Sequence, residues 1–337
     1  MLRQLKESLR LDLIWLRHLQ MLERVRADFR ATGLTVPALK LVPSDALMAA
    51  GDILISRESK GFALHFSNKT HHRFLKALFG KASAFVHWLD VASPDVPQIL
   101  VDCTDGVGPS NARYAYSVNR AGTVALPDVY FTRSQGYAAF DEKFKELNIP
   151  WSHRHDRIVW RGALNGMGHF NLDKGFCNHP GVIQRLRMAQ HCVGSEIDFR
   201  FVSTGTNFDT ALQSAGLLAD CIPALDWATA KFGVDIDGFT NAWSNFLQRL
   251  KLGCCVLKVE SQFGFRQWYY DQIRPWEHYV PIKADLSDLH DQIDWVRRND
   301  ARAAEIASNG QRFAVGLTLE SETLVAARII NQTEGVA

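Results

Sequence analysis

The chain has 337 residues, of which 47% are hydrophobic, 22% charged and 11% aromatic. This composition is typical of a folded globular protein with one large domain or two medium ones, and it excludes a disordered or fibrous chain. The 38 Lys and Arg residues nearly balance the 36 Asp and Glu residues, which leaves a net charge of +2. The overall charge therefore gives no indication of a nucleic-acid partner.

The sequence favours a cytoplasmic protein. No apolar run approaches the roughly 18 residues that a membrane-spanning helix needs, and the N-terminus lacks the pattern of a signal peptide. The histidines match no zinc-binding spacing, so no metal ligands are predicted. The cysteines are scattered and are interpreted as reduced core thiols: Cys103, Cys177, Cys192, Cys221, Cys254 and Cys255.

The first predicted element is a long amphipathic helix over Leu2–Phe29. Leucines recur there every three or four residues, while arginines and a lysine occupy the other faces. The first 150 residues carry 19 Lys or Arg against 15 Asp or Glu, so this part of the chain is slightly basic. We expect the helix to pack on its own domain through the leucines, and peripheral contact with an anionic membrane is the alternative.

After this helix, the pattern predicts alternating strands and helices, which favours an α/β fold with parallel strands. Phe140–His155, which is charged and contains a proline, is the predicted linker between two halves. Asp285 and Ser287 are predicted helix N-caps. The expected strands are Ala84–Trp88, Gln98–Val101, Arg157–Trp160, Phe199–Val202, Cys254–Val259 and Tyr279–Ile282, and the expected helices are Val182–Gln190, Asn241–Leu252, Gln262–Ile273, Leu286–Asn299 and Ala301–Phe313.

Two aspartates follow the predicted strand that ends at Val101. Asp102 and Asp105 lie where an α/β protein presents side chains to a ligand, and either carboxylate could act as a general base on a hydroxyl group. The structural alternative is that they only form the turn, as the pair Asp105-Gly106 commonly does.

A glycine-rich turn follows the predicted strand that ends at Trp160. Backbone N–H groups in such a turn can approach a phosphate closely, and the guanidinium of Arg161 can bind a diphosphate with two donors. The alternative for Arg161 is an ion pair with a structural carboxylate. The turn lacks both the GxGxxG and the GK[ST] patterns, so neither a nicotinamide cofactor nor hydrolysis of a nucleoside triphosphate is supported.

Two later segments also end in polar residues. The first breaks at Gly238 and enters a predicted helix whose first turn holds Thr240, Asn241 and Ser244, an anion site or an ordinary N-cap. The second is a buried strand that carries Lys258 and Glu260 near its end, where a carboxylate could bind ribose hydroxyls.

The C-terminal third resembles glycosyltransferase family 90, which includes lipopolysaccharide- and capsule-modifying transferases and protein O-glucosyltransferases and O-xylosyltransferases. The most specific segment is Arg274–Leu289, which reads RPWEHYVPIKADLSDL. It follows the run from Gly253 to Tyr270 and precedes Glu305–Gly310, which also resemble the family. The similarity covers about residues 98–313, and it includes a Trp160-Arg161-Gly162 turn and a donor-site helix over 235–253.

The resemblance implies a GT-B fold, which has two Rossmann-like domains facing a central cleft. We expect an acceptor-side domain over 1–150, a nucleotide-sugar donor domain over 151–312, and a tail helix over 313–337 that packs back on the first domain. It further implies an inverting transfer without a metal or another cofactor, with Asp105 as the general base and Asp102 as the fallback. The implied donor-binding residues are Arg161, Gly162, Gly238, Thr240, Asn241, Ser244, Lys258, Glu260 and Arg266.

The chain departs from the animal members at two cationic positions. Leu164 and Asn165 stand where those enzymes have a second Arg, and Ser244 or Asn245 stands where they have an Arg in the donor helix. Backbone N–H groups, Lys258 and Arg266 are therefore expected to contribute more to binding the diphosphate. The resemblance implies transfer of glucose or xylose from a UDP-sugar to a surface glycan or glycolipid acceptor, such as lipopolysaccharide core or capsule. The alternatives are a non-catalytic nucleotide- or glycan-binding protein and a nucleotide-dependent oxidoreductase.

Overall fold

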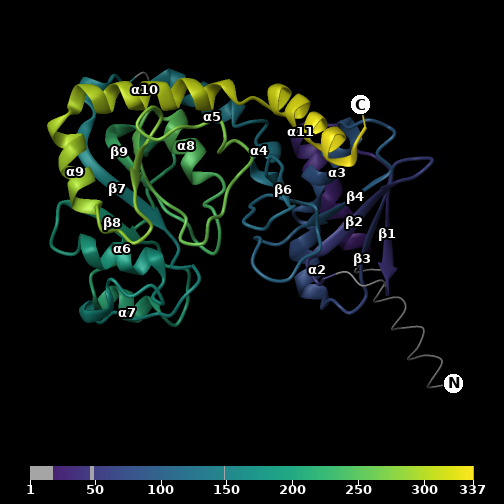
Figure 1. Ribbon diagram of the computed structural model, residues 1–337, viewed down its shortest axis with the longest axis horizontal. Helices are drawn as coiled ribbons and strands as arrows, with labels where there is room; N and C mark the ends of the chain where they lie inside the picture. Colours follow the sequence, from purple (N-terminus) through teal and green to yellow (C-terminus); the bar gives the residue numbers. More distant parts are fainter. Residues whose placement is uncertain (1–17, 46–48, 148, 337) are drawn as a thin grey trace. The chain divides into compact units, whose positions relative to one another are not determined.

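A computed structural model describes residues 18–45, 49–147 and 149–336, which form two compact α/β units. The first unit comprises the chain up to Gly136 and from Thr318 onward, and the second runs from Tyr137 to Leu317 (Figure 1). The expected α/β class and the presence of two sheet-containing units are confirmed. The unit boundaries differ from the expected ones at 150 and 312.

The first unit contains a mixed sheet of six strands in the order β1-β3-β2-β4-β5-β6. Strand β2 runs antiparallel to both of its neighbours, while the other pairs are parallel. The sheet is therefore less regular than a Rossmann sheet. Its strands are β1 (Leu39–Ser44), β2 (Asp52–Arg57), β3 (Phe62–Ser67), β4 (Gln98–Asp102), β5 (Tyr114–Ala115) and β6 (Val124–Ala125).

Helices cover this sheet, and one of them is buried over most of its length. Helix α3 (Ala82–Val91) occupies the segment for which a strand over 84–88 was predicted, so that prediction is wrong. Every residue from Ala82 to Leu89 is buried, and a helix that is apolar on all sides lacks the periodicity that separates it from a buried strand. The other helices of this unit are 18–32, α2 (His72–Phe79), α4 (Val129–Arg133) and α11 (Leu319–Glu334).

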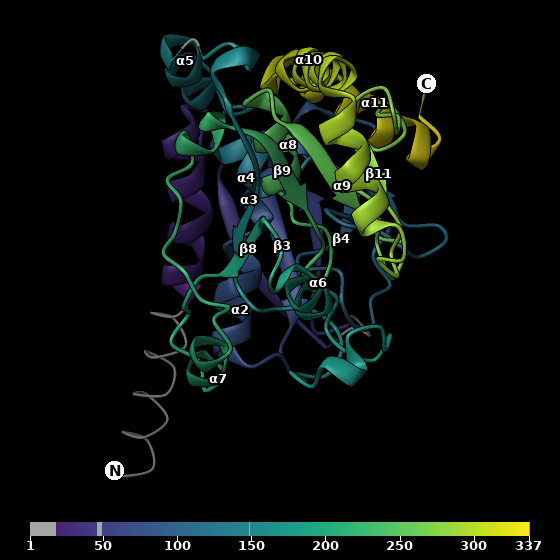
Figure 2. The ribbon, with the colours of Figure 1, turned by 90° about the vertical axis from the view of Figure 1, so that its left-hand side faces the viewer.

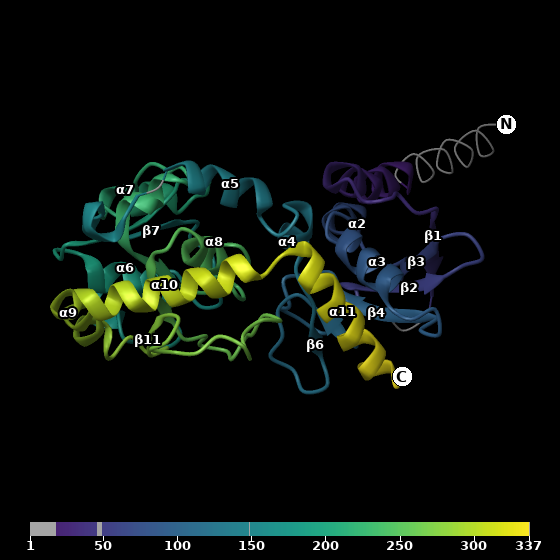
Figure 3. The same cartoon turned by 90° about the horizontal axis from the view of Figure 1, so that it is seen from above.

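The first and the last described helices both belong to the first unit. Helix 18–32 packs through the buried side chains of Met21, Val25 and Phe29, while the earlier part of the predicted first helix lies outside the described residues. Helix α11 packs beside α3, and Tyr114 donates a hydrogen bond of 2.7 Å to Glu334 (Figure 3). These contacts place the tail helix in the first unit.

The second unit contains a parallel sheet of five strands in the order β11-β10-β9-β7-β8. After β8 the chain crosses over β7 to form β9, so β7 and β9 flank the point at which the strand order reverses. In open α/β sheets, ligands bind outside the carboxyl ends of the strands at this point. The strands are β7 (His155–Gly162), β8 (Ile197–Phe201), β9 (Ala230–Asp235), β10 (Cys255–Val259) and β11 (Val280–Ile282).

Figure 2 shows the helices of this unit around its sheet, with α10 near α8 and α9 near β11. The first half of the predicted linker, up to Leu147, instead belongs to helix α5, and Asp141 of this helix forms an ion pair of 2.7 Å with Lys251 of the same unit. The predicted helix over 262–273 is absent, and turns occupy that segment. The helices are α5 (Ala138–Leu147), α6 (Gln184–Cys192), α7 (Asp209–Ser214), α8 (Asn245–Lys251), α9 (Leu289–Arg298) and α10 (Asp300–Gly316).

Candidate functional site

The carboxyl edge of the second sheet brings together the loops that follow β7, β9 and β10. The loops after β7 and β9 touch, because a Cβ added to Gly166 would lie 3.4 Å from the carbonyl oxygen of Gly238. Gly166 has a φ of +147°, a conformation that other residues rarely adopt. At the predicted glycine-rich turn, the backbones of the loops after β7 and β9 therefore approach each other closely, at the switch point of the sheet.

A residue that the sequence did not indicate, Arg185 of α6, holds these two loops together. Its guanidinium donates hydrogen bonds of 2.9 to 3.1 Å to the carbonyl oxygens of Asp237, Ala163 and Ile236, and a further bond to Asn165 Oδ1. Burial lowers the pKa of Arg185 to about 10. From the sequence alone, an arginine in the first turn of a helix is expected to be solvent-exposed. Its role in holding the loops together can be recognised only from the structure, in which the two loops lie in contact.

Lys258 forms part of the core beneath the edge. Its Nζ lies 2.7 Å from Oδ2 of the fully buried Asp235 and faces the rings of Phe246 and Tyr270. Burial opposes the charge of Lys258, but the carboxylates of Asp235 and Asp237 raise its pKa above the ordinary value. The prediction that Lys258 binds a diphosphate does not fit this geometry, because the ammonium group compensates a buried carboxylate.

Arg161 also has a structural partner. Its guanidinium donates to the carboxylate of Asp198 at 2.9 Å and to the carbonyl oxygens of Trp160, Asp198 and Asp220. Arg157 binds the same carboxylate, and the two cations hold the pKa of Asp198 below its ordinary value although burial would raise it. Of the two interpretations of Arg161, the geometry favours the ion pair with a structural carboxylate.

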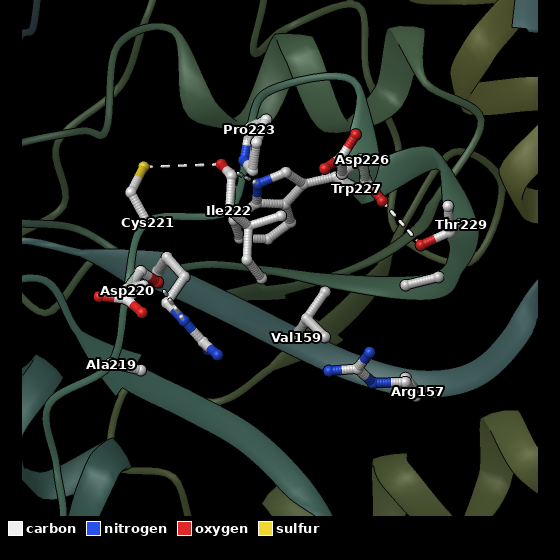
Figure 4. Close-up of a pocket in the computed structure, with 12 residues that line it drawn as sticks. Arg157, Val159, Ala219, Asp220, Cys221, Ile222, Pro223, Asp226, Trp227 and Thr229 are labelled. Carbon is white, nitrogen blue, oxygen red and sulfur yellow. Dashed lines mark hydrogen bonds between the residues drawn. The ribbon is translucent and has the colours of Figure 1, made fainter.

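Arg161 lines a pocket of about 560 Å³ on one face of β7. Side chains alternate between the faces of a strand, so Arg157, Val159 and Arg161 share this face while Trp160 lies on the other. Figure 4 shows Arg157 and Val159 on the strand beneath the segment that carries Trp227. The pocket therefore lies on the sheet face and is separate from the loops at the carboxyl edge.

The predicted anion site at a helix N-terminus differs from the structure. Helix α8 begins at Asn245 rather than at 241, so Thr240 and Asn241 lie in the preceding loop and Ser244 is the N-cap. The amide of the buried Asn241 donates to Asp237 Oδ1 at 3.2 Å and to the carbonyl oxygen of Phe265 at 3.0 Å. These residues stabilise the loops, and the short helix does not begin where the prediction requires.

Several predicted residues remain at the exposed part of the edge. Glu260 directly follows β10 and is exposed, and its side chain forms no hydrogen bond or ion pair within the described part of the chain. Arg266 is half-exposed and pairs with the exposed Asp271. Gly162 ends β7, where a Cβ would lie 2.6 Å from the ring of Trp160. The ring of Phe239, which was not predicted, is also exposed beside Gly238.

In the first unit, the two candidate bases have different surroundings. Asp102 ends β4 and is buried, and its carboxylate accepts hydrogen bonds from Thr104 and, at 3.0 Å, from Arg120. Asp105 lies in the following turn with its side chain 53% exposed and pairs through Oδ1 with Lys81. Only Asp105 is accessible to a substrate, so the geometry favours it over the fallback Asp102.

Neither a metal cluster nor a membrane span is found in the described ranges. Among these residues, no group of three or more His, Cys, Asp or Glu side chains is placed to hold a metal ion. None of the described helices is long and apolar enough to cross a bilayer.

The model of glycosyl transferase family 90 matches residues 141–325, which is more than half of the chain. The chain belongs to this family. The matched range includes almost all of the second unit, and therefore the loops at the carboxyl edge of its sheet.

Individual relatives match shorter stretches. The uncharacterized protein 179R of Invertebrate iridescent virus 6 is 39% identical over 190 residues, which cover 50% of this chain and 16% of the viral protein. Protein O-glucosyltransferase 3 of Rattus norvegicus is 41% identical over 90 residues, which cover 26% of this chain and 17% of the rat protein. The matches thus cover less than a fifth of either relative.

One solved structure also aligns with the chain. It is the crystal structure of Anabaena Alr3699/HepE in complex with UDP-glucose, with 11% identity and a TM-score of 0.34. The alignment covers 58% of this chain and 52% of the other. At this level of similarity the alignment carries no argument about the site.

Proposed function

We propose that this member of family 90 transfers a sugar from a nucleotide sugar to a hydroxyl group of an acceptor. The observation that carries the proposal is the cluster of carbonyl oxygens that Arg185 gathers from the loops after β7 and β9. The C=O and N–H groups of a trans peptide point in opposite directions, so the N–H groups of Leu164 and Asp237 point away from the guanidinium. N–H groups that face away from a buried cation at a switch point suit a diphosphate.

In this proposal, the exposed residues at the same edge bind the rest of the donor. Glu260 accepts hydrogen bonds from the ribose hydroxyls, because its carboxylate is exposed and has no internal partner among the described residues. The exposed ring of Phe239 offers an apolar face to the base. Arg266 and the backbone N–H groups compensate the charge of the diphosphate, and they replace Arg161 and Lys258 in that role.

The proposed reaction is a single displacement that inverts the anomeric carbon. The acceptor oxygen forms a bond to that carbon while the bond to the nucleoside diphosphate breaks. The hydroxyl proton passes to the carboxylate of Asp105, and the diphosphate leaves as an anion. Fixed donors stabilise the developing charge without a metal ion.

We further propose UDP-glucose or UDP-xylose as the donor and a surface glycan, such as lipopolysaccharide core or capsule, as the acceptor. The name of the rat relative, protein O-glucosyltransferase 3, supports glucose. The family resemblance supports both sugars and the glycan acceptor.

Release of UDP from UDP-glucose and UDP-xylose tests the reaction, since water can replace an unknown acceptor. We expect turnover that survives a chelator and falls at least about 100-fold in Asp105→Asn, because general-base catalysis contributes at least that factor. UDP affinity should not change in that variant. Asp95→Asn, which alters another exposed aspartate of the first unit, is the control. Full turnover in Asp105→Asn would show that another group is the base.

Direct binding of UDP tests the donor site independently of turnover. Glu260→Gln should weaken UDP binding about tenfold, which corresponds to one charge-assisted hydrogen bond. Glu196→Gln, at a site that is 83% exposed, should leave the affinity unchanged. UDP binding without sugar release would instead support a non-catalytic nucleotide-binding protein, and unchanged binding in Glu260→Gln would exclude the proposed ribose contact.

A further inference from the structure

The turn that presents Asp105 is attached to two buried carboxylates at the end of the first sheet. Asp52 begins β2 and Asp102 ends β4, and the two residues are direct partners in the antiparallel register. Their relative exposures are 0% and 1%. Burying two carboxylates at these positions is costly unless they are hydrogen-bonded. Their hydrogen-bond partners therefore indicate what the two carboxylates do.

Asp102 connects to the Asp105 turn through Thr104. Its Oδ1 accepts hydrogen bonds from the backbone N–H of Thr104 at 2.8 Å and from the hydroxyl of Thr104 at 2.5 Å. The same hydroxyl oxygen accepts a hydrogen bond of 3.0 Å from the N–H of Gly106. The residues on both sides of Asp105 are therefore fixed by one side chain, and the charge of Asp102 strengthens the chain of bonds.

The remaining oxygens of the two carboxylates hold the rest of the loop. Arg120 donates to Asp102 Oδ2 and, at 3.0 Å, to the carbonyl oxygen of Ser110. Asp52 accepts hydrogen bonds from the hydroxyl of Ser110 at 2.5 Å and from the N–H of Asn111 at 2.9 Å. Residues 104 to 111 are thus attached at both ends to one buried ionic cluster.

A glycine leaves room for this arrangement. A Cβ added to Gly51 would lie only 2.2 Å from Cγ2 of Thr104 and 3.5 Å from Asp102 Oδ1. Gly51 also accepts a hydrogen bond from the N–H of Cys103 at 3.1 Å through its carbonyl oxygen. Thr104 therefore fits against a backbone surface that tolerates no side chain.

We infer that Thr104 and Asp102 are positioning residues that orient the Asp105 carboxylate toward the acceptor hydroxyl. This inference rests on the proposed function, in which Asp105 is the general base. A base must lie within hydrogen-bonding distance of the proton that it removes, and small displacements of a reacting group reduce the rate strongly. Lys81 contacts Oδ1 of Asp105. Oδ2 has no hydrogen-bond partner among the described residues, so this oxygen is available to accept the proton of the acceptor hydroxyl.

Thr104→Val tests the inference, because it removes the hydroxyl and keeps the branched methyl group against Gly51. We expect kcat for UDP release to fall about tenfold, since the hydroxyl's bonds to the Asp102 carboxylate and to the Gly106 N–H are both lost. The KM for the UDP-sugar and the affinity for UDP should stay within a factor of two. Thr104→Ser retains the hydroxyl and should restore most of kcat. Thr123→Val, which removes another hydroxyl bonded to a carbonyl of the same unit, is the control.

Gly51→Ala provides an independent perturbation, since the added methyl group displaces Thr104 without altering any hydrogen-bonding group. It should also lower kcat with little change in KM. If Asp105→Asn abolishes turnover while Thr104→Val and Gly51→Ala keep wild-type kcat, the positioning role is wrong and the base assignment stands. If Asp105→Asn keeps full turnover, the base assignment is wrong and the positioning role is overturned with it.

Discussion

The two candidate loop regions are both anchored by buried ions, but the ions have opposite charge. In the second unit, the guanidinium of Arg185 gathers backbone carbonyl oxygens from the loops after β7 and β9. In the first unit, the carboxylates of Asp52 and Asp102 gather N–H and hydroxyl groups from the loop after β4. The buried cation thus binds carbonyl oxygens of its loops, and the buried anions bind N–H and hydroxyl groups of theirs.

This difference suits the two proposed substrates. N–H groups that face away from a buried cation suit an anionic diphosphate. In the first unit, the N–H groups of Thr104, Gly106 and Asn111 are bonded within the loop region, and the loop presents a carboxylate that can accept a proton from a neutral hydroxyl. In both regions, the buried charged residue is structural, and the residue available for chemistry is its exposed neighbour. Asp102 and Lys258 belong to the first class, and Asp105 and Glu260 belong to the second.

The largest expected effect comes from removing the cation of the second unit. Arg185→Met leaves the carbonyl oxygens of the buried residues Ile236 and Asp237 without their donor, and it should lower the free energy of unfolding by about 3–5 kcal/mol. Chemical denaturation measures this change, and UDP binding should be lost in the same variant. Arg312→Met, in the exposed face of α10, is the matched control and should change stability by less than about 0.5 kcal/mol. A loss below about 1 kcal/mol in Arg185→Met would contradict the anchoring role.

The next prediction concerns the buried pair of Lys258 and Asp235. Lys258→Met leaves the carboxylate of Asp235 buried without its cation and should cost about 3 kcal/mol of stability. The double variant Lys258→Met/Asp235→Leu removes both charges and should recover most of that loss. Denaturation curves of the three proteins test this expectation. If Lys258→Met is fully stable but weakens UDP binding, Lys258 is a ligand-binding residue after all.

Much of the fold could be predicted from the sequence, because strands at Gln98–Asp102, His155–Gly162 and Cys255–Val259 are short apolar runs that end in polar or glycine residues. Buried helix α3 could not be separated from a strand by its pattern. The segment after Glu260 has a helical spacing of apolar residues, but turns form there. Long-range contacts override local preference in such segments.

The sequence predicts the positions of the candidate site residues better than it predicts their roles. The sequence identified the ends of β4, β7 and β10, since polar or glycine residues follow each strand, and it indicated the loop after β9 only as a segment that breaks at Gly238. The sequence does not show which charged residues are paired internally, so it predicts Arg161 and Lys258 as donor ligands although each has an internal carboxylate partner. Arg185 escaped prediction because its partners are backbone carbonyls, which no residue pattern records.

The smallest expected effect tests the anionic anchor of the first unit through its pH dependence. Burial and the nearby Asp102 raise the pKa of Asp52 above its ordinary value, while hydrogen bonds from Ser110 and Asn111 oppose this shift. Between the ordinary pKa near 3.8 and the raised folded-state pKa, the folded protein therefore binds more protons than the unfolded chain, and this group's contribution to stability falls as the pH rises.

The variant Asp52→Asn tests this dependence, because it keeps an acceptor for the N–H of Asn111 and removes the charge. At pH 7 the variant should be as stable as the wild type or more stable by up to about 1 kcal/mol. Measured by denaturation at pH 4 and pH 7, the stability of the variant relative to the wild type should increase with pH. The opposite trend would mean that the ionised carboxylate of Asp52 is the form that stabilises the loop, and the two anchors would then be alike in depending on a buried full charge.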